Sequence, residues 1–89
     1  MMYEYMTLDD NTAIAHSDMK SDGTVKVYIE KPIDGGFKHV TCYLPKYEWC
    51  DNDGFSNDDI AKLQKIIENN AHLIIEFSQQ GGFANASGF

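Results

Sequence analysis

The sequence predicts an α+β domain in which a four-stranded antiparallel meander precedes one long C-terminal helix that packs on one face of the sheet. Three observations support this class. Apolar residues recur at helical spacing from Ser56 to Gln80, whereas two earlier segments alternate apolar and polar residues as half-buried strands do. Turn-forming residues separate the strand-like segments.

The first two strands are expected at 3–8 and 12–19. Asp9-Asp10-Asn11 lies between them and is a turn signal, because these side chains bond their own backbone and tolerate left-handed geometry. Ala13-Ile14-Ala15 fits either a strand or a helix by itself, and the short interval between two turn signals favours a strand.

The third strand, 24–31, follows the hairpin signal Asp22-Gly23, and Pro32 is expected to end it. After a turn at 33–36, the fourth strand covers 37–44 and stops at Pro45. Alternation places one apolar set of these two strands under the helix: Val25, Val27, Ile29, Val40, Cys42 and Leu44. Residues 46–55 are expected to form a loop.

The helix carries its own start and stop signals. Ser56 is a good N-cap, and Asp59 completes a weak capping box with it. Gly81-Gly82 can end the helix, since glycine reaches the left-handed conformation without steric cost. We therefore expect a single domain over 1–80 and a flexible glycine-rich tail over 81–89.

The charge and composition of the chain limit the classes of function that we expect. The formal net charge is −7, from 14 acidic residues against 7 lysines, with no arginine. Recognition of phosphates and bases commonly uses the bidentate guanidinium group of arginine, which this chain lacks. Direct nucleic-acid binding is therefore not expected. Neither a membrane-spanning run nor a signal-peptide pattern is present, so a cytoplasmic protein with free Cys42 and Cys50 is expected, without membrane contact.

One surface suited to interaction is the sheet face that the helix leaves open. Alternation places Tyr28, His39, Thr41 and Tyr43 there, with Phe37 and, by a weaker argument, Tyr3 and Tyr5. Tyrosine suits interfaces, because its ring buries while its hydroxyl finds a partner. Ordinary cross-strand pairing on a solvated sheet explains the same residues, so both interpretations stay open.

A second surface is the flank of the helix. Ile66, Leu73 and Phe77 widen its apolar arc to about 200°, which is more than one sheet covers. Either the tail and the loop around Trp49 cover this flank, or a second subunit does. Asn70 lies inside the arc and needs a hydrogen-bond partner if buried, most simply the backbone.

No catalytic, cofactor or metal site is expected. Asp51-Asn52-Asp53-Gly54 resembles the centre of a calcium loop, but the EF-hand alignment puts Trp49 at the first ligand position and Ile60 at the twelfth. His39 and Cys42 point to opposite faces of one strand, so they cannot form a Cys–His nucleophile pair, which requires the two side chains within hydrogen-bond reach. An enzyme would require His39, Tyr28, Tyr43 and a loop carboxylate to converge in a cleft.

The stretches 42–49 (CYLPKYEW) and 70–74 (NAHLI) resemble a small protein family of low-GC Gram-positive bacteria and their mobile elements. The similarity extends over most of the chain, including 3–8 and 54–56. The resemblance implies a bacterial cytosolic setting and a role beside toxin–antitoxin or defence-related neighbours. It brings no assigned activity and no catalytic residues.

The sequence thus favours a non-enzymatic interaction module that binds a protein partner, or a second copy of itself as a homodimer. The alternative is an acidic regulator, of antitoxin or anti-defence type, that occupies a basic nucleic-acid-binding site on another protein.

Overall fold

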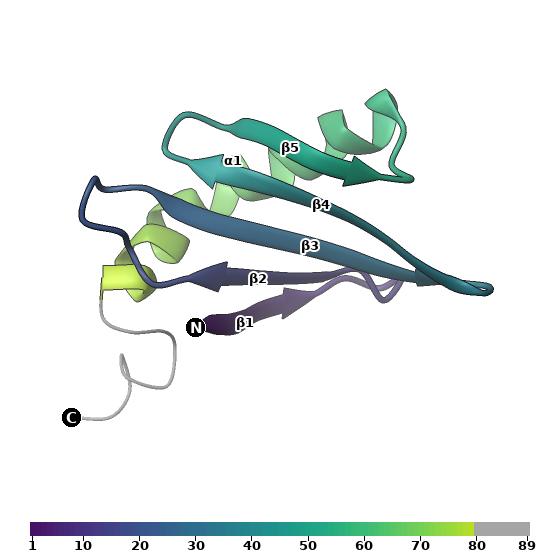
Figure 1. Cartoon of the computed structure of the whole chain (residues 1–89), viewed down its shortest axis with the longest axis horizontal. Coiled ribbons are helices and arrows are strands. Elements are labelled where there is room, and N and C mark those ends of the chain that lie inside the picture. The colour runs from purple at the N-terminus through teal and green to yellow at the C-terminus, as the bar shows by residue number, and fades with distance from the viewer. Residues whose placement is uncertain (80–89) are drawn as a thin grey trace.

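The computed structural model describes residues 1–79, which form one five-stranded antiparallel sheet and one helix (Figure 1). The strands lie in the sheet in chain order: β1 (Met2–Thr7), β2 (Ala13–Ser17), β3 (Val25–Ile33), β4 (Gly36–Leu44) and β5 (Glu48–Asp53). Helix α1 (Asn57–Gln79) runs obliquely behind the sheet in Figure 1, and the front of the sheet carries no second layer from these residues. The predicted α+β class and antiparallel meander are confirmed.

The core lies between α1 and the predicted apolar face of β3 and β4. Val25 pairs with Leu44, Val27 with Cys42 and Ile29 with Val40, so the two alternating runs are in register and face the helix together. The helix contributes Leu63, Ile67 and Ile74 to this core, and the other buried apolar side chains are Ile14 and Phe55. Burying side chains of this size stabilises the fold by roughly 1.5–3 kcal/mol each.

The helix begins as predicted. The Asp59 N–H donates to Ser56 Oγ at 3.1 Å, and the Ser56 N–H donates to Asp59 Oδ2 at 3.2 Å, which is a reciprocal capping box. At the other end, the Met19 N–H donates to the Ser78 carbonyl at 3.1 Å and ties the helix to the β2–β3 turn. The expected helix end at Gly81-Gly82 and the tail 81–89 lie outside the described residues.

The strand count of four was wrong, because residues 46–55 are not simply a loop. Glu48–Asp53 forms β5, in which Trp49 pairs with Cys42 and Cys50 pairs with Thr41. An edge strand needs a partner on one side only, so this acidic run can pair with β4 despite its weak β propensity.

Pro32 was expected to end the third strand. It instead continues β3 and pairs with Phe37 inside the β3–β4 hairpin. The β2 ladder stops at the pair Ala13–Glu30, so β3 has no neighbour on that side beyond Glu30. A proline is tolerated where its missing N–H has no ladder bond to make. The hairpin closes through Asp34 and Gly35, and Gly35 adopts a φ of 81°.

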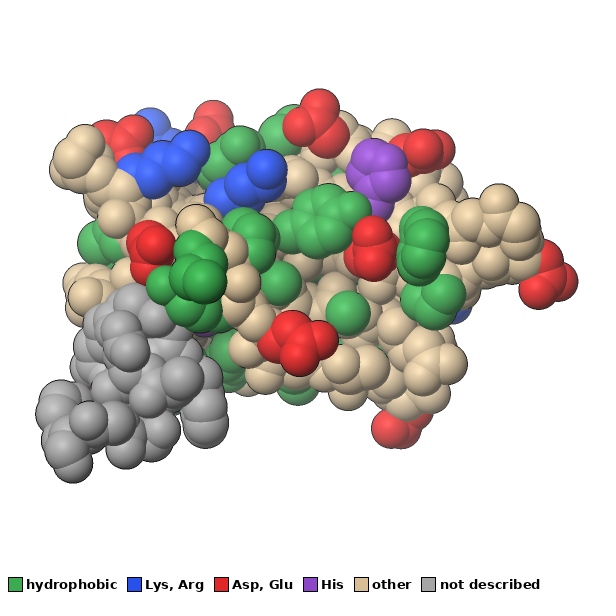
Figure 2. Space-filling model, turned by 60° about the horizontal axis from the view of Figure 1, so that its bottom comes forward, with side chains coloured by type: hydrophobic (Ala, Val, Ile, Leu, Met, Phe, Trp, Pro, Cys, Tyr) green, Lys and Arg blue, Asp and Glu red, His purple; other side chains and the backbone are tan. Residues whose placement is uncertain are grey.

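Both edge strands are irregular. The β1–β2 register shifts between Glu4 and Met6, and the β4–β5 register shifts opposite Asp51, whose φ is 54°. Figure 2 turns the β1 edge toward the reader and shows acidic side chains scattered among hydrophobic ones. Bulges and charges disfavour the addition of a further strand at a sheet edge.

Within residues 1–79, no helix combines the length and the apolar character that crossing a membrane requires.

Candidate functional site

The open face of the sheet contains a shallow concavity of about 490 Å³. Three of the four sheet residues predicted from the sequence line it, namely Tyr28, His39 and Thr41. They converge because Tyr28 pairs with Thr41 across the β3–β4 ladder and His39 lies two residues before Thr41 on the same face. The remaining lining residues are Lys26, Asp51, Asn52 and Asp53.

The rings of Tyr28 and His39 stack across two strands, with centroids 6.2 Å apart and an interplanar angle of 24°. The Tyr28 hydroxyl donates to Glu30 Oε1 at 3.0 Å, which fixes the outer end of the phenol ring. Partial burial, and then the neighbouring Glu30 carboxylate, raises the pKa of Tyr28, so this hydroxyl remains a neutral donor. The pair presents a flat aromatic platform whose rim is polar.

A carboxylate completes the platform on the β5 side. Asp53 pairs with His39 in the ladder, and its Oδ2 lies 3.4 Å from His39 Nε2. The contact is an ion pair when the imidazole is protonated. Asp53 is mostly exposed, so its carboxylate is accessible to a cation from solvent or from a partner.

Thr41 is only 3% exposed although it lies on the open face. It therefore forms the floor of the concavity rather than a protruding contact. Tyr43, the fourth predicted sheet residue, does not line the concavity; its half-buried ring lies 5.4 Å from Lys20 Nζ in a cation–π contact. The concavity and Tyr43 thus occupy different parts of the open face, with Lys26 at the concavity and Lys20 over the Tyr43 ring.

The arrangement falls short of a nucleophilic centre. The Cα atoms of His39 and Thr41 lie about 6.6 Å apart on one strand face. Among residues 1–79, the His39 ring contacts Tyr28 and Asp53 and makes no hydrogen bond to a hydroxyl that it could activate as a nucleophile. Of the groups that an enzyme would bring together, Tyr28, His39 and a carboxylate converge, whereas Tyr43 stands apart. Within residues 1–79, no group of three His, Cys, Asp or Glu side chains is placed to hold a metal ion.

Two of the three residues predicted on the helix flank, Ile66 and Phe77, have partners in the described chain. Phe77 lies beside Tyr5 with ring centroids 6.2 Å apart, and half-buried Ile66 packs against the core. Leu73 is also half-buried. Trp49 faces the helix side, where its indole N–H donates to Gln64 Oε1 at 2.9 Å. Gln64 and Ile66 are two residues apart, about 200° around the helix, so Trp49 contacts the opposite side of α1 from this flank. Tyr5 of β1, rather than the loop around Trp49, covers part of the predicted flank.

Tyr3 and Tyr5 do not lie on the open face, where the weaker sequence argument placed them. Both rings contact His16 on the helix side, with centroids 5.6 and 6.4 Å away. The Tyr5 hydroxyl also donates to Asn70 Oδ1 at 2.8 Å, and Asn70 Nδ2 donates to the Ile66 carbonyl. Asn70 therefore has the backbone partner expected of it and a side-chain partner as well.

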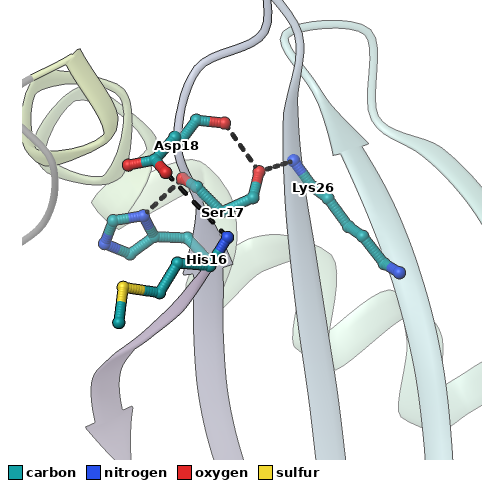
Figure 3. A network of polar contacts seen from close by, with 5 residues as sticks. His16, Ser17, Asp18 and Lys26 are labelled. Carbon is teal, nitrogen blue, oxygen red and sulfur yellow. Dashed lines mark hydrogen bonds and ion pairs between the residues drawn. The ribbon is translucent and has the colours of Figure 1, made fainter.

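Sequence reasoning missed His16, which is fully buried. Its Nδ1 lies 2.9 Å from the Ser17 carbonyl, while its Nε2 has no hydrogen-bond partner among residues 1–79. Figure 3 shows His16 pointing away from Lys26, on whose side the Ser17 hydroxyl accepts the Lys26 N–H. The signal was available, because His16 shares the strand face of buried Ile14.

No protein-family model, curated protein or solved structure matches the chain.

Proposed function

We propose that the protein is an interaction module that binds a basic segment of a partner protein on the uncovered face of its sheet. The observation that carries the proposal is the concavity in which the stacked rings of Tyr28 and His39 lie beside Asp53. Aromatic rings supply contact area at low entropic cost, and accessible carboxylates select cationic side chains. A lysine or arginine of the partner would sit on the aromatic platform with its charge toward Asp53.

The charges of this face favour a foreign partner over a second copy. Glu30, Glu48 and Asp53 lie on the open side of the sheet, where Lys26 is the cation that lines the concavity. A twofold dimer would oppose two copies of a surface on which these carboxylates outnumber the cations Lys20 and Lys26, so the net charges of the two copies would repel each other. A basic partner meets the same carboxylates with the opposite sign.

A second candidate is an acidic regulator of antitoxin or anti-defence type, which occupies a basic nucleic-acid-binding site on its target. It is favoured by the excess of 14 acidic residues over 7 lysines and by a cluster of carboxylates in β5 and the start of α1. The members of this cluster are Glu48, Asp51, Asp53, Asp58 and Asp59. The setting implied by the family resemblance also suits such a role.

The test compares capture of binding proteins by the wild-type chain and by a variant that combines Tyr28→Ser with Asp53→Asn. Lys65→Ser is the matched control, because Lys65 is exposed on α1, away from the open face. We expect the double variant to lose a basic partner that the wild type and Lys65→Ser both retain. A partner retained by the double variant would contradict the proposal, provided that circular dichroism shows the variant folded.

Light scattering at low and high salt separates a partner from a second copy. We expect a monomeric mass at both salt concentrations; a dimer that Tyr28→Ser dissociates would instead make a second copy the occupant. For the regulator, nucleic acid should displace the captured partner, and the complex should weaken steeply with salt. A complex indifferent to both would exclude that candidate.

A further inference from the structure

A second concavity, of about 160 Å³, lies on the helix side of the sheet. It is enclosed by the first half of α1, the β1–β2 turn and the ends of β3 and β4 nearest their hairpin. Four apolar side chains line it: Leu8, Phe55, Leu63 and Ile66. Its polar lining is Asp10, Thr12, Lys31, Lys38, Asp59 and Lys62.

Three of the seven lysines therefore surround one pocket of an acidic protein. Lys31 and Lys38 are direct partners in the β3–β4 ladder, so they extend from the same face of the sheet. The Cβ atoms of such a pair lie about 5 Å apart, and like charges at this separation repel each other. The third cation, Lys62, approaches from α1.

The carboxylates present do not neutralise these cations fully. Asp10 pairs with Lys31 at 3.2 Å. Asp59 is committed to the helix cap: its bonds with Ser56 lower its pKa first, and the charges of Lys38 and Lys62 lower it further. Asp59 is thus the carboxylate of the pocket lining that acts on both Lys38 and Lys62. Neither lysine makes an ion pair within 4 Å among residues 1–79.

The backbone beneath Lys38 is shaped to hold its side chain. Gly54 has a φ of 105°, and a Cβ placed on it would lie 2.8 Å from Lys38 Cγ. The absence of a side chain at Gly54 therefore lets the aliphatic stem of Lys38 lie against the β5–α1 connection. The lysine is positioned at the pocket rather than free in solvent.

We propose that this pocket binds a small monocarboxylate whose apolar part is about the size of one aromatic ring. A cavity near 150 Å³ accommodates benzene in another protein, so the volume suits a ring or a short branched chain. The apolar lining takes that body, and the carboxylate lies between Lys38 and Lys62 and supplies the missing negative charge. This site is independent of the open face, which lies across the sheet.

Benzoate is the probe, and amide NMR shifts of the full chain at low salt are the measurement. We expect saturable shifts at Thr12, Gly54 and Leu63. Two matched probes separate the features: benzyl alcohol lacks the charge and acetate lacks the apolar body. Each should bind at least about tenfold more weakly than benzoate, because each loses one of the two interactions.

Variants test the charges in both directions. Lys62→Gln should weaken benzoate binding about tenfold, while Lys65→Gln, outside the pocket, should leave it unchanged. Asp10→Asn should tighten binding, because it removes a negative charge from the pocket lining and leaves Lys31 without its ion pair. The proposal is overturned if benzoate shifts no pocket amide or if benzyl alcohol binds as tightly as benzoate. It is also overturned if Lys65→Gln weakens benzoate binding as much as Lys62→Gln does. Much tighter binding of a dipeptide ending in phenylalanine would replace the small molecule with a peptide terminus.

Discussion

The Tyr5 hydroxyl donates a hydrogen bond of 2.8 Å to Asn70 Oδ1, and this bond joins edge strand β1 to the middle of α1. The two residues are 65 positions apart, and both are partly buried. Tyr5 is also the residue at which the β1–β2 register shifts. The bulge thus accompanies a tyrosine that faces the helix, and the contact covers part of the wide apolar arc of α1.

Tyr5→Phe should lower the free energy of unfolding by about 1 kcal/mol, because the substitution leaves Asn70 Oδ1 without a partner in a partly buried place. Urea denaturation followed by circular dichroism measures the change. Tyr28→Phe is the matched control, since it removes a hydrogen bond to Glu30 on the open face, where water can replace it. Equal losses of unfolding free energy in the two variants would show that the Tyr5–Asn70 bond contributes no more to stability than the exposed Tyr28–Glu30 bond.

Ser56→Ala should cost about 1 kcal/mol of stability, because it removes the acceptor that Ser56 Oγ provides to the Asp59 N–H. Ser56→Asp should recover most of that loss, since aspartate is also a good N-cap. Ser21→Ala in the exposed β2–β3 turn is the control and should leave the denaturation midpoint unchanged. If Ser56→Asp were as unstable as Ser56→Ala, the capping explanation would fail.

The two cysteines should differ sharply in reactivity. Cys42 is buried in the core, and burial raises the pKa of its thiol to about 12; Cys50 is exposed. The pKa of Cys50 is raised too, first by desolvation and then by Asp51, so its reaction should be moderate rather than fast. With a chromogenic disulfide at pH 8, we expect one thiol to react in the native protein and the second only on unfolding.

Cys50→Ser should abolish the native-state reaction and leave the thiol released by denaturant. Cys42→Ser should preserve the native-state reaction while lowering stability, because it places a hydroxyl in the core. Two thiols reacting at equal rates in the folded protein would contradict the buried position of Cys42.

The sequence predicted those parts of the fold in which a local pattern matches its environment. Val25, Val27 and Ile29 alternate because β3 has one buried and one open face, and the same alternation brought Tyr28 to the opposite side. His39 and Thr41 could be placed beside Tyr28 for the same reason. The helix start was predictable because Ser56 and Asp59 form a local motif.

The features that were missed depend on contacts that no local pattern shows. The acidic run at β5 is a strand because β4 offers it an edge, and its bulge at Asp51 hides the alternation. The lysine pocket depends on the pairing of Lys31 with Lys38 and on the position of Lys62 along α1. His16 shares the strand face of buried Ile14, but its ring contacts with Tyr3 and Tyr5 depend on the pairing of β1 with β2.

The carboxylate of Asp10 should make the fold less stable in acid. Its pKa falls from 3.8 to about 2, mainly through hydrogen bonds with Thr12 and further through Lys31. A folded-state pKa below the unfolded value means that the ionised form stabilises the native state. This contribution is therefore complete above about pH 4 to 5, and it is lost as the pH falls toward 2.

We expect the stability difference between the wild type and Asp10→Ala to shrink as the pH is lowered from 6 toward 2, measured by urea denaturation at each pH. Lys31→Met should keep most of this pH dependence, because the Thr12 contacts are the larger cause of the lowered pKa. Thr12→Val, which keeps the shape of a buried residue but removes its hydroxyl, should lose more of it. A difference between wild type and Asp10→Ala that stays constant with pH would show that the Asp10 carboxylate is not held in its ionised form by the fold.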